Sequence, residues 1–245
     1  MQQIKKILIY KDGQVFYVKD TSKEFHTQYG MIAAKELEKT DGSRVLTNTG
    51  VEMTLLSPQF VDSFAKISRG AQIITRKDVG AIIAETGLNK EWIVVDCGAG
   101  SGGMACSLAY AAKKVVSYDL RKDHLETVEK NMKFLGLDNY ELKNADVYEK
   151  IDEKDVDLIT VDVPEPWKVL ENATKSLKPG GFLVSYSPSV TQSMNAVLKC
   201  EEFGLLHIKT IELIERAWDI RERVCHPKYK ELNHTGFLSF FRKIR

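Results

Sequence analysis

The sequence has 245 residues and a mass of 27.7 kDa, which is enough for one main domain and a small additional module. Hydrophobic residues make up 43% and charged residues 28%, a composition that excludes a predominantly disordered chain. The net charge of +1 excludes a basic field over the whole molecule, but it is compatible with a local basic patch.

No apolar run is long enough to span a bilayer, and the first residues carry no signal-peptide pattern. Four cysteines stand at positions 97, 106, 200 and 225, without the spacing of a zinc knuckle. We therefore expect a cytoplasmic protein with buried thiols and no metal site. A pairing of Cys200 with Cys225 stays open at this point.

Residues 1–65 differ from the rest of the chain and predict a small all-β domain. Short runs rich in β-branched and aromatic residues cover 7–10, 15–18, 44–46 and 53–56. Glycine-containing pairs at 12–13 and 49–50 separate these runs and favour turns. The segment has no cysteine and a single histidine without an obvious partner, so we expect binding or assembly rather than catalysis.

Residues 66–245 alternate strands and helices, which predicts an α/β fold with a doubly wound, Rossmann-like sheet. Strands are expected at 92–95, 115–118, 140–142, 156–161 and 182–186, and helices at 103–112, 121–135, 167–177 and 192–203. Lys178-Pro179-Gly180-Gly181 is expected to close the third of these helices. Two final strands, at 207–214 and 236–241, are predicted to form an edge hairpin.

A glycine-rich loop, Gly98-Ala99-Gly100-Ser101-Gly102-Gly103, follows the first strand of this region and leads into its first helix. Doubly wound sheets bind ligands beyond the carboxyl ends of their strands, where this loop lies. Its spacing fits NAD and S-adenosylmethionine (SAM) equally, because both ligands require close approach of the backbone.

Three acids favour SAM over NAD. Asp96 precedes the first glycine by two residues, where methyltransferases carry an acid near the methionine end of the cofactor. Asp119 ends the second strand, in place to accept both ribose hydroxyls, a feature that NAD enzymes share. Asp146 follows the third strand, near the expected adenine amine. The alternative is that these acids are merely solvated at the edge of the sheet.

The fourth strand runs into Asp162-Val163-Pro164-Glu165-Pro166-Trp167, a segment that two prolines make stiff and extended. This places Asp162 at the end of the strand, beside the expected methyl group. Methyltransferases that act on amino groups of bases carry a related Asp/Asn-Pro-Pro-aromatic loop here. The alternative is a rigid turn with a packed tryptophan.

Taken together, these segments resemble the tRNA adenine-N1 methyltransferases of the TrmI family. The resemblance covers nearly the whole chain and includes residues 27–30, 69–74, 98–104, 119–124, 162–167 and 234–238. The most specific segments are Asp162 to Trp167 and the C-terminal His234-Thr235-Gly236-Phe237-Leu238, whereas the glycine loop alone is not specific.

The resemblance implies a class I SAM-dependent methyltransferase fold, with an antiparallel last strand, behind a small N-terminal β domain. It implies methyl transfer from SAM to N1 of an adenine in the tRNA T-loop, at position 58 and, in archaeal members, also at position 57. It further implies a homotetramer that binds the tRNA elbow. Eukaryotic relatives pair two different subunits, one with a degraded SAM site, so the intact motifs here imply a catalytic chain.

N1 of adenine carries a free lone pair, so the reaction requires positioning and electrostatic stabilisation rather than deprotonation. Asp162 is the predicted catalytic residue, because its carboxylate can accept a hydrogen bond from the N6 amine and stabilise the cationic methylated ring. The predicted cofactor-binding residues are Gln72, Asp96, Gly98, Gly100, Ser101, Gly102, Gly103, Met104, Asp119, His124, Asp146, Val147 and Asp162.

The chain departs from the family pattern in three places. Thr75-Arg76-Lys77-Asp78 stands where Tyr-Pro-Lys-Asp or its His variant is usual, so a ring expected to line the adenine pocket is missing. Asp96 and Asp119 stand where Glu is common, which gives a shorter reach. Cys225-His226-Pro227 stands where Arg-Pro is common, which puts one phosphate contact in doubt.

RNA binding is expected from local charge, since residues 211–245 contain eight basic and five acidic side chains. A solvated mixed-charge face explains this surplus equally well. The basic residues are Arg216, Arg221, Arg223, Lys228, Lys230, Arg242, Lys243 and Arg245, and the acids are Glu212, Glu215, Asp219, Glu222 and Glu231.

Three other functions are alternatives to a tRNA methyltransferase. A protein or small-molecule methyltransferase of the same fold would not use the N-terminal module for RNA. A non-catalytic tRNA-binding subunit predicts a damaged SAM loop, and the loop is intact. An NAD dehydrogenase fits the glycines but leaves Asp162 to Trp167 unexplained.

Overall fold

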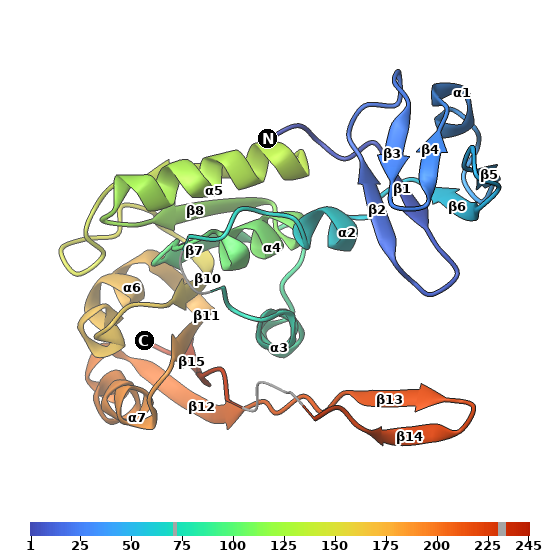
Figure 1. The fold of residues 1–245 in the computed structure, drawn as a ribbon. Coiled ribbons are helices and arrows are strands. Elements are labelled where there is room, and N and C mark those ends of the chain that lie inside the picture. The colour runs from blue at the N-terminus through green and yellow to red at the C-terminus, as the bar shows by residue number, and fades with distance from the viewer. Residues whose placement is uncertain (71–72, 230–233) are drawn as a thin grey trace. The chain divides into compact units, whose positions relative to one another are not determined.

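The computed structural model describes residues 1–70, 73–229 and 234–245. The chain divides into two compact units, one formed by Met1–Ser68 with Lys133–Gly136 and the other by Arg69–Met132 with Leu137–Arg245. Figure 1 labels the elements of both. The predicted boundary between residues 65 and 66 stays a prediction, which limited proteolysis can test.

The N-terminal unit contains a four-stranded antiparallel sheet in the order β2-β1-β6-β5. Its strands are β1 (Lys6–Ile9), β2 (Val15–Val18), β5 (Arg44–Leu46) and β6 (Glu52–Leu56), close to the four runs predicted from the sequence. A separate hairpin of β3 (Phe25–Thr27) and β4 (Gly30–Ile32), and the short helices α1 (Ala34–Leu37) and α2 (Phe60–Phe64), were not predicted. Elements of three to five residues are too short to show a hydrophobic period.

The second unit is built on a seven-stranded sheet in the order β12-β15-β11-β10-β7-β8-β9. The strands β7 to β11 pair in parallel, whereas β15 is antiparallel to both of its neighbours. The bounds are β7 (Ile93–Cys97), β8 (Lys114–Tyr118), β9 (Tyr140–Lys143), β10 (Val156–Val161), β11 (Leu177–Ser187), β12 (Leu205–Glu212) and β15 (Phe237–Lys243). The predicted doubly wound sheet with an antiparallel last strand is therefore confirmed.

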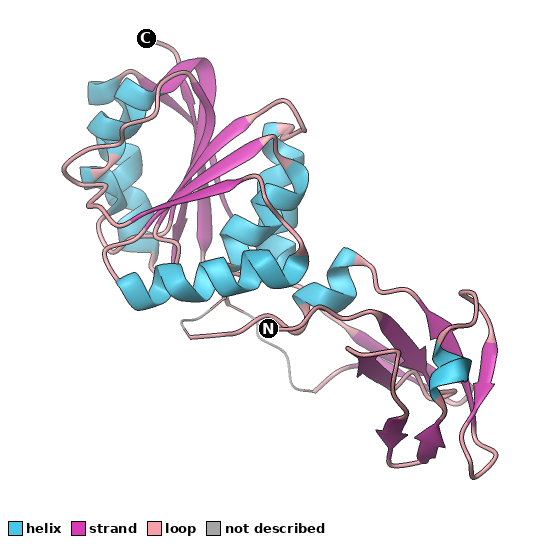
Figure 2. Ribbon diagram, turned by 90° about the horizontal axis from the view of Figure 1, so that it is seen from above, coloured by secondary structure: helices cyan, strands magenta, loops and turns pink. Residues whose placement is uncertain are grey.

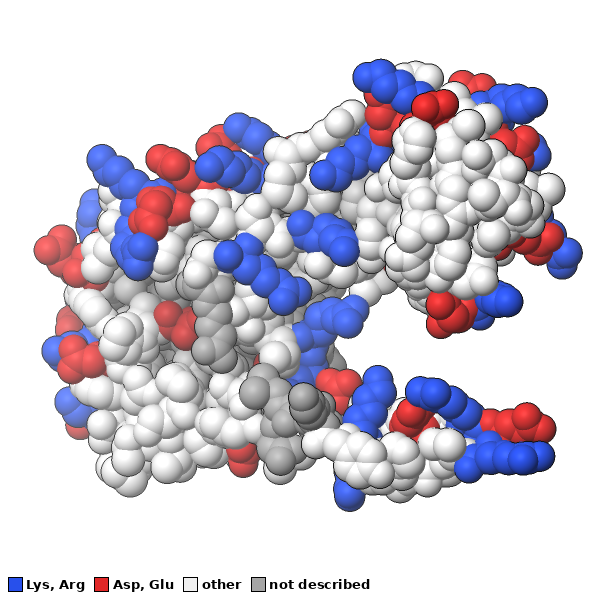
Figure 3. Space-filling model, viewed as in Figure 1, with Lys and Arg blue, Asp and Glu red and all other residues white. Residues whose placement is uncertain are grey.

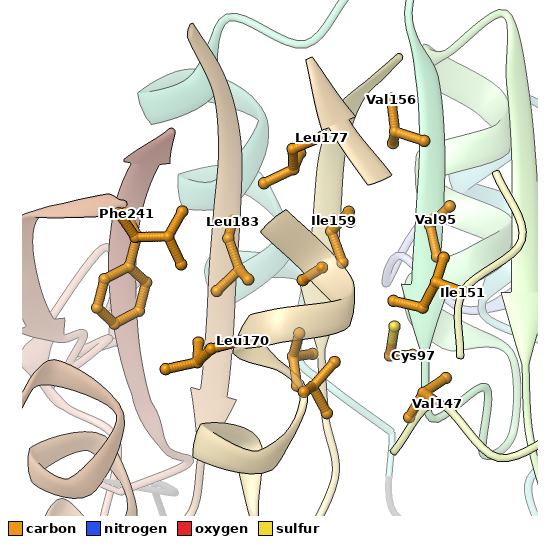
Figure 4. Packing of buried hydrophobic residues seen from close by; sticks show 14 of the residues in the cluster. Val95, Cys97, Val147, Ile151, Val156, Ile159, Leu170, Leu177, Leu183 and Phe241 are labelled. Atoms are coloured by element: carbon orange, nitrogen blue, oxygen red, sulfur yellow. The ribbon is translucent and has the colours of Figure 1, made fainter. Parts of the chain in front are cut away.

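Helices cover both faces of this sheet (Figure 2). They are α3 (Arg76–Thr86), α4 (Gly103–Ala111), α5 (Lys122–Leu135), α6 (Leu170–Ser176) and α7 (Val190–Lys199), with short 3-10 helices η1 (Pro166–Lys168) and η2 (Cys200–Phe203). Every residue of β10 is buried, as expected for a central strand covered on both sides. Side chains from β7, β10, β11 and β15 meet those of α6 in one hydrophobic core (Figure 4).

The final strands β12 and β15 pair antiparallel at the edge of the sheet, as predicted, with β12 outermost. Two predictions for this unit were incomplete or wrong. Lys178 to Gly181 belong to the start of β11 rather than to a helix end. Helix α3 and a further hairpin, β13 (Trp218–Arg221) with β14 (Val224–Pro227), were not predicted. No helix within the described residues is both long and apolar enough to cross a membrane.

Candidate active site

A cavity of about 410 Å³ opens at the carboxyl ends of β7, β8, β9 and β10. This is the edge of a doubly wound sheet at which ligands bind. The cavity is large enough for a small organic cofactor. Its walls are formed by Gly98, Gly100, Tyr118, Asp119, Leu120, Arg121, His124, Ala145, Asp146, Val147, Tyr148, Asp162, Val163 and Pro164.

Gly98 brings the ends of β7 and β10 together. Its φ is +96°, and a Cβ built on it would lie 2.2 Å from the carbonyl oxygen of Asp162. The N–H of Asp162 in turn donates to the carbonyl of Cys97 at 2.8 Å. Any residue other than glycine at position 98 would therefore push the Asp162 loop away, in addition to the cost of a positive φ.

Asp119 is held in a fixed orientation at the end of β8. Its Oδ2 accepts the N–H of Gly100 at 3.0 Å and contacts Nδ1 of His124 at 3.0 Å, and its Oδ1 accepts the N–H of Arg121 at 2.9 Å. A carboxylate has about four acceptor sites, so these three contacts leave capacity for a ligand hydroxyl. The glycine loop and the acid of β8 thus form one rigid corner of the cavity.

The loop after β9 forms the opposite wall. Nδ2 of Asn144 donates to the carbonyls of Asp119 and Leu120, which ties this loop to the one after β8. Oδ1 of Asp146 accepts the N–H of Tyr148 at 2.8 Å, which fixes the carboxylate in a turn. Asp146 and the neighbouring Val147 both line the cavity, and their role on the adenine side stays a prediction.

Asp96 lies beneath the cavity rather than in its wall. Its carboxylate accepts hydrogen bonds from Thr160 Oγ1 at 2.8 Å and Ser117 Oγ at 3.2 Å, the residues opposite it on the two neighbouring strands. Burial raises the pKa of Asp96 to about 7, with a further contribution from the charge of Asp162. A direct contact of Asp96 with a ligand stays a prediction.

Asp162 is a half-buried carboxylate in the wall of the cavity. Burial raises its pKa to about 6, and the charge of Asp119 adds to this effect. Among the residues that the structure describes, none donates a hydrogen bond to this carboxylate. A titratable group in a cleft with free acceptor oxygens is suited to orienting a polar ligand or stabilising a positive charge.

The other predicted residues of the glycine loop do not line the cavity but pack next to the residues that do. Ser101 is buried, and its Oγ accepts the N–H of Gly70 at 3.1 Å. Gly102 and Gly103 lie against Val128 and Ile73 with no room for a larger side chain, since an added Cβ would come within 3.1 Å of each. Met104 is buried in the first turn of α4. Gln72 falls outside the described part of the chain.

A second cluster joins the two ends of the unit. The fully buried carboxylate of Asp78 accepts hydrogen bonds from Thr75 at 2.7 Å, Lys77 at 2.8 Å and Thr235 at 2.8 Å. Lys77 Nζ also donates to Thr235 Oγ1 at 2.6 Å, and Tyr186 donates its hydroxyl to the Thr235 carbonyl at 2.5 Å. The hydroxyl at position 75 therefore serves as an anchor within the fold.

The adjacent residues complete this cluster. A Cβ added to Gly236 would lie 2.6 Å from the ring of Tyr186, so only glycine fits there. His234 contacts Glu212 at 2.6 Å and the Pro188 carbonyl at 3.0 Å, and the bond to Glu212 raises the pKa of the imidazole. These contacts tie the C-terminal His-Thr-Gly segment to the rest of the fold.

Sequence reasoning missed several residues of the cavity, notably Tyr118, Tyr148, Val163 and Pro164. Tyr118 ends β8, and the other three lie within two residues of the predicted acids Asp146 and Asp162, so closeness to these positions was the available signal. All four cysteines are free, so the open pairing of Cys200 with Cys225 is not formed. The expectation of buried thiols is wrong for Cys225, which is exposed, whereas the other three cysteines are buried. No group of three or more potential metal ligands occurs in the described residues.

The basic residues of the C-terminal region are distributed over the hairpin β13–β14 and the end of β15. Figure 3 shows basic and acidic side chains mixed along the hairpin. Arg221 pairs with Asp219 at 2.9 Å, so part of this charge is neutralised locally. Lys230 and Glu231, both counted in the predicted patch, lie outside the described residues.

Comparisons with known proteins agree on one family. A family model described as "tRNA methyltransferase complex GCD14 subunit" matches residues 64–236. The chain is 33% identical to a tRNA (adenine(57)-N(1)/adenine(58)-N(1))-methyltransferase TrmI of Methanocaldococcus jannaschii, over 97% of this chain and 94% of that protein. It is 32% identical to a tRNA (adenine(58)-N(1))-methyltransferase TrmI of Thermus thermophilus, over 89% of this chain and 88% of that protein.

Two solved structures extend this agreement to the fold. A SAM-dependent O-methyltransferase of Thermotoga maritima matches with a TM-score of 0.87 and 28% identity, covering all of this chain and 94% of that one. The tRNA (m1A58) methyltransferase TrmI of Aquifex aeolicus matches with a TM-score of 0.82 and 24% identity, covering all of this chain and 99% of that one. The fold is that of the class I SAM-dependent methyltransferases.

Proposed function

This chain belongs to the family of the tRNA methyltransferase complex GCD14 subunit, and from that premise we propose that it methylates N1 of the adenine at position 58 of the tRNA T-loop, with SAM as the methyl donor. Position 57 is proposed as a second target, because the archaeal relative is named for both. The observation that carries the proposal is the Asp162 carboxylate, which lines the cavity beside the glycine loop and accepts no hydrogen bond from any residue that the structure describes.

The cavity suits a cationic cofactor. The charge of Asp162 raises the pKa of Asp96, and the charge of Asp119 raises that of Asp162, so three carboxylates repel one another around the cavity. A positively charged ligand relieves this repulsion. SAM supplies an electrophilic methyl group on a sulfonium ion.

Each predicted residue has a proposed role in holding that cofactor. Asp119, oriented by His124 and by the N–H of Gly100, accepts from the ribose hydroxyls. Asp146 and Val147 bind the adenine, and Asp96 acts on the methionine end through the field of its buried charge. Gly98 and Gly100 permit the close approach of the backbone, and Ser101, Gly102, Gly103 and Met104 support the loop. Gln72 is retained as a proposal from the family resemblance.

Asp162 is proposed to act on the target base. Its free oxygen accepts a hydrogen bond from the N6 amine, which turns N1 toward the methyl group and favours the positive charge that develops on the ring. No proton has to be removed from N1, so a carboxylate that is ionised at neutral pH is sufficient. The target adenine must leave the stacked elbow of the tRNA, at a cost of a few kcal/mol.

We also propose that the chain assembles as a homotetramer. Val190, Met194 and Leu198 form an exposed apolar stripe at four-residue spacing on α7, and Leu206 and Ile208 are exposed on the edge strand β12. Such a surface is unusual on a monomer. Light scattering at micromolar concentration should give four times the mass of one chain, and a monomeric mass with full activity would contradict the assembly.

The function is tested by incubating the protein with labelled SAM and an unmodified tRNA transcript, followed by digestion and mass spectrometry of the nucleosides. The expected product is 1-methyladenosine, reduced or lost when adenine 58 of the transcript is replaced. Transcripts changed at position 57 alone report the second target. Absence of labelled 1-methyladenosine from all transcripts would refute the proposal.

The second candidate is methylation of an oxygen or of a small molecule or protein, which the name of the Thermotoga maritima relative favours. It predicts label in a 2′-O-methylated nucleoside or in a non-RNA fraction of an extract. The same digestion separates these products, because 1-methyladenosine and 2′-O-methyladenosine differ in retention and fragmentation.

A further inference from the structure

The loop that carries Asp162 has few backbone groups with which to hold its shape. Pro164 and Pro166 have no N–H, so the N–H of Glu165 is the only donor between them. That N–H donates to the hydroxyl of Tyr148 at 3.0 Å. On the other side, Nε2 of Gln192 donates to the carbonyl of Pro164 at 2.8 Å.

Tyr148 also belongs to the cavity wall that is proposed to receive the cofactor. It lines the cavity directly after Asp146 and Val147. Its own N–H bonds to Asp146, and its carbonyl accepts Nδ2 of Asn172 at 2.9 Å, so its backbone is fixed in place. The Tyr148 ring packs at the margin of the same core cluster as Val163 and Trp167.

One side chain thus connects the wall proposed for the adenine of the cofactor with the loop proposed for the target base. We infer that Tyr148 is a positioning residue that couples occupancy of the cofactor cavity to the placement of the Asp162–Trp167 loop. The inference rests on the proposed function for the identity of cofactor and substrate. Tyr148 itself needs no contact with the reacting atoms, because it acts through the N–H of Glu165.

Tyr148→Phe is the informative variant, because it keeps the ring and its packing and removes only the hydroxyl that accepts the N–H of Glu165. Losing one net hydrogen bond at the Asp162 loop should lower the single-turnover rate of tRNA methylation about fivefold to tenfold. SAM affinity measured by calorimetry should change less than about twofold, since the wall residues Asp146 and Val147 remain. Tyr17→Phe, in the other compact unit, controls for loss of a tyrosine hydroxyl and should leave both quantities unchanged.

Trp167 gives a readout that requires neither RNA nor turnover. In the wild type, adding SAM should change the emission of Trp167, identified as the signal that disappears in Trp167→Phe and not in Trp92→Phe or Trp218→Phe. In Tyr148→Phe the SAM-induced change should be strongly reduced, although SAM still binds. A fluorescence response that is the same in Tyr148→Phe and wild type would overturn the coupling.

A purely structural role makes different predictions. It lowers the melting temperature, the SAM affinity and the rate together, and that joint loss would overturn the inference. If Tyr148 acts through Asp162, adding Tyr148→Phe to Asp162→Ala should cause no further loss of rate, and an additive loss would also count against it. Failure of the proposed function is separable, because absence of tRNA methylation in the wild type leaves the Trp167 response to SAM intact.

Discussion

The charge of Asp162 should make SAM binding depend on pH. Its pKa of about 6 means that the carboxylate is about 90% protonated at pH 5 and almost fully ionised at pH 8. If the ionised form alone attracts the sulfonium ion, the apparent dissociation constant of SAM should rise about tenfold between pH 8 and pH 5. This factor corresponds to about 1.4 kcal/mol of binding free energy.

The substitution that isolates this contribution is Asp162→Asn, which keeps an oxygen acceptor and removes the charge. The variant should bind SAM about as well as the wild type at pH 5 and about tenfold more weakly than the wild type at pH 8. Asp96 also titrates near neutral pH, but both proteins contain it, so the difference between the two curves belongs mainly to Asp162.

The assay is calorimetry at constant ionic strength from pH 5 to pH 8, with S-adenosylhomocysteine as a second ligand. That molecule has the same adenosine and amino acid parts but a neutral thioether, so its affinity should lack the step near pH 6. The reasoning is refuted if Asp162→Asn keeps the full pH dependence of the wild type, or if both ligands show the same step.

Three further predictions concern the scaffold of the site. Gly98→Ala should weaken SAM binding at least about tenfold, because the Cβ displaces the Asp162 carbonyl. Gly87→Ala, at a comparable positive φ with nothing within 4 Å, should cost only about 1–2 kcal/mol of stability by thermal unfolding. In the folded protein Asp96 stays protonated up to about pH 7, whereas in the unfolded chain it loses its proton near pH 4. The stability that this group contributes therefore falls as the pH rises from about 4 to about 7. Asp96→Asn should therefore raise the melting temperature more at pH 8 than at pH 5, and equal shifts at both pH values would contradict this. Thr235→Val should lower the free energy of unfolding by about 1–3 kcal/mol, because the buried Asp78 carboxylate loses a hydrogen-bond donor. Thr174→Val should be neutral or stabilising, since the buried Thr174 hydroxyl has no partner in the described structure.

The order of strands and helices around the cavity could be predicted because local sequence encodes it. β10 is mostly apolar and is rich in β-branched residues, and α5 repeats its apolar residues every three or four positions. The glycines of the loop are required by positive φ and close contacts at single positions, so they can be recognised without knowing the partner. The acids at the ends of β8, β9 and β10 followed from the rule that ligands bind at that edge.

The remaining features depend on contacts between distant residues. Thr235 donates to Asp78 across 157 positions, and Tyr148 meets Glu165 across 17, so neither pair leaves a periodic signal. The hairpin β13–β14 was missed because its strands have only four residues each, which is too short for a clear alternating pattern. Asp96 was predicted to help hold the cofactor, which stays a prediction, whereas its enclosure by Thr160 and Ser117 becomes visible only when three strands are paired.

The ring that the family pattern places at position 75 poses a specific problem for this chain. The Thr75 hydroxyl donates to the buried carboxylate of Asp78, which also binds Thr235 and Lys77. The side chain at position 75 is therefore part of the link between α3 and the start of β15. A tyrosine there would remove one of the three donors that stabilise a fully buried carboxylate, a loss that is expensive in an apolar environment. We therefore expect selection between neighbouring adenines to depend on other groups that can face the base, such as the Asp162 carboxylate, which lines the cavity and accepts no hydrogen bond from the residues that the structure describes.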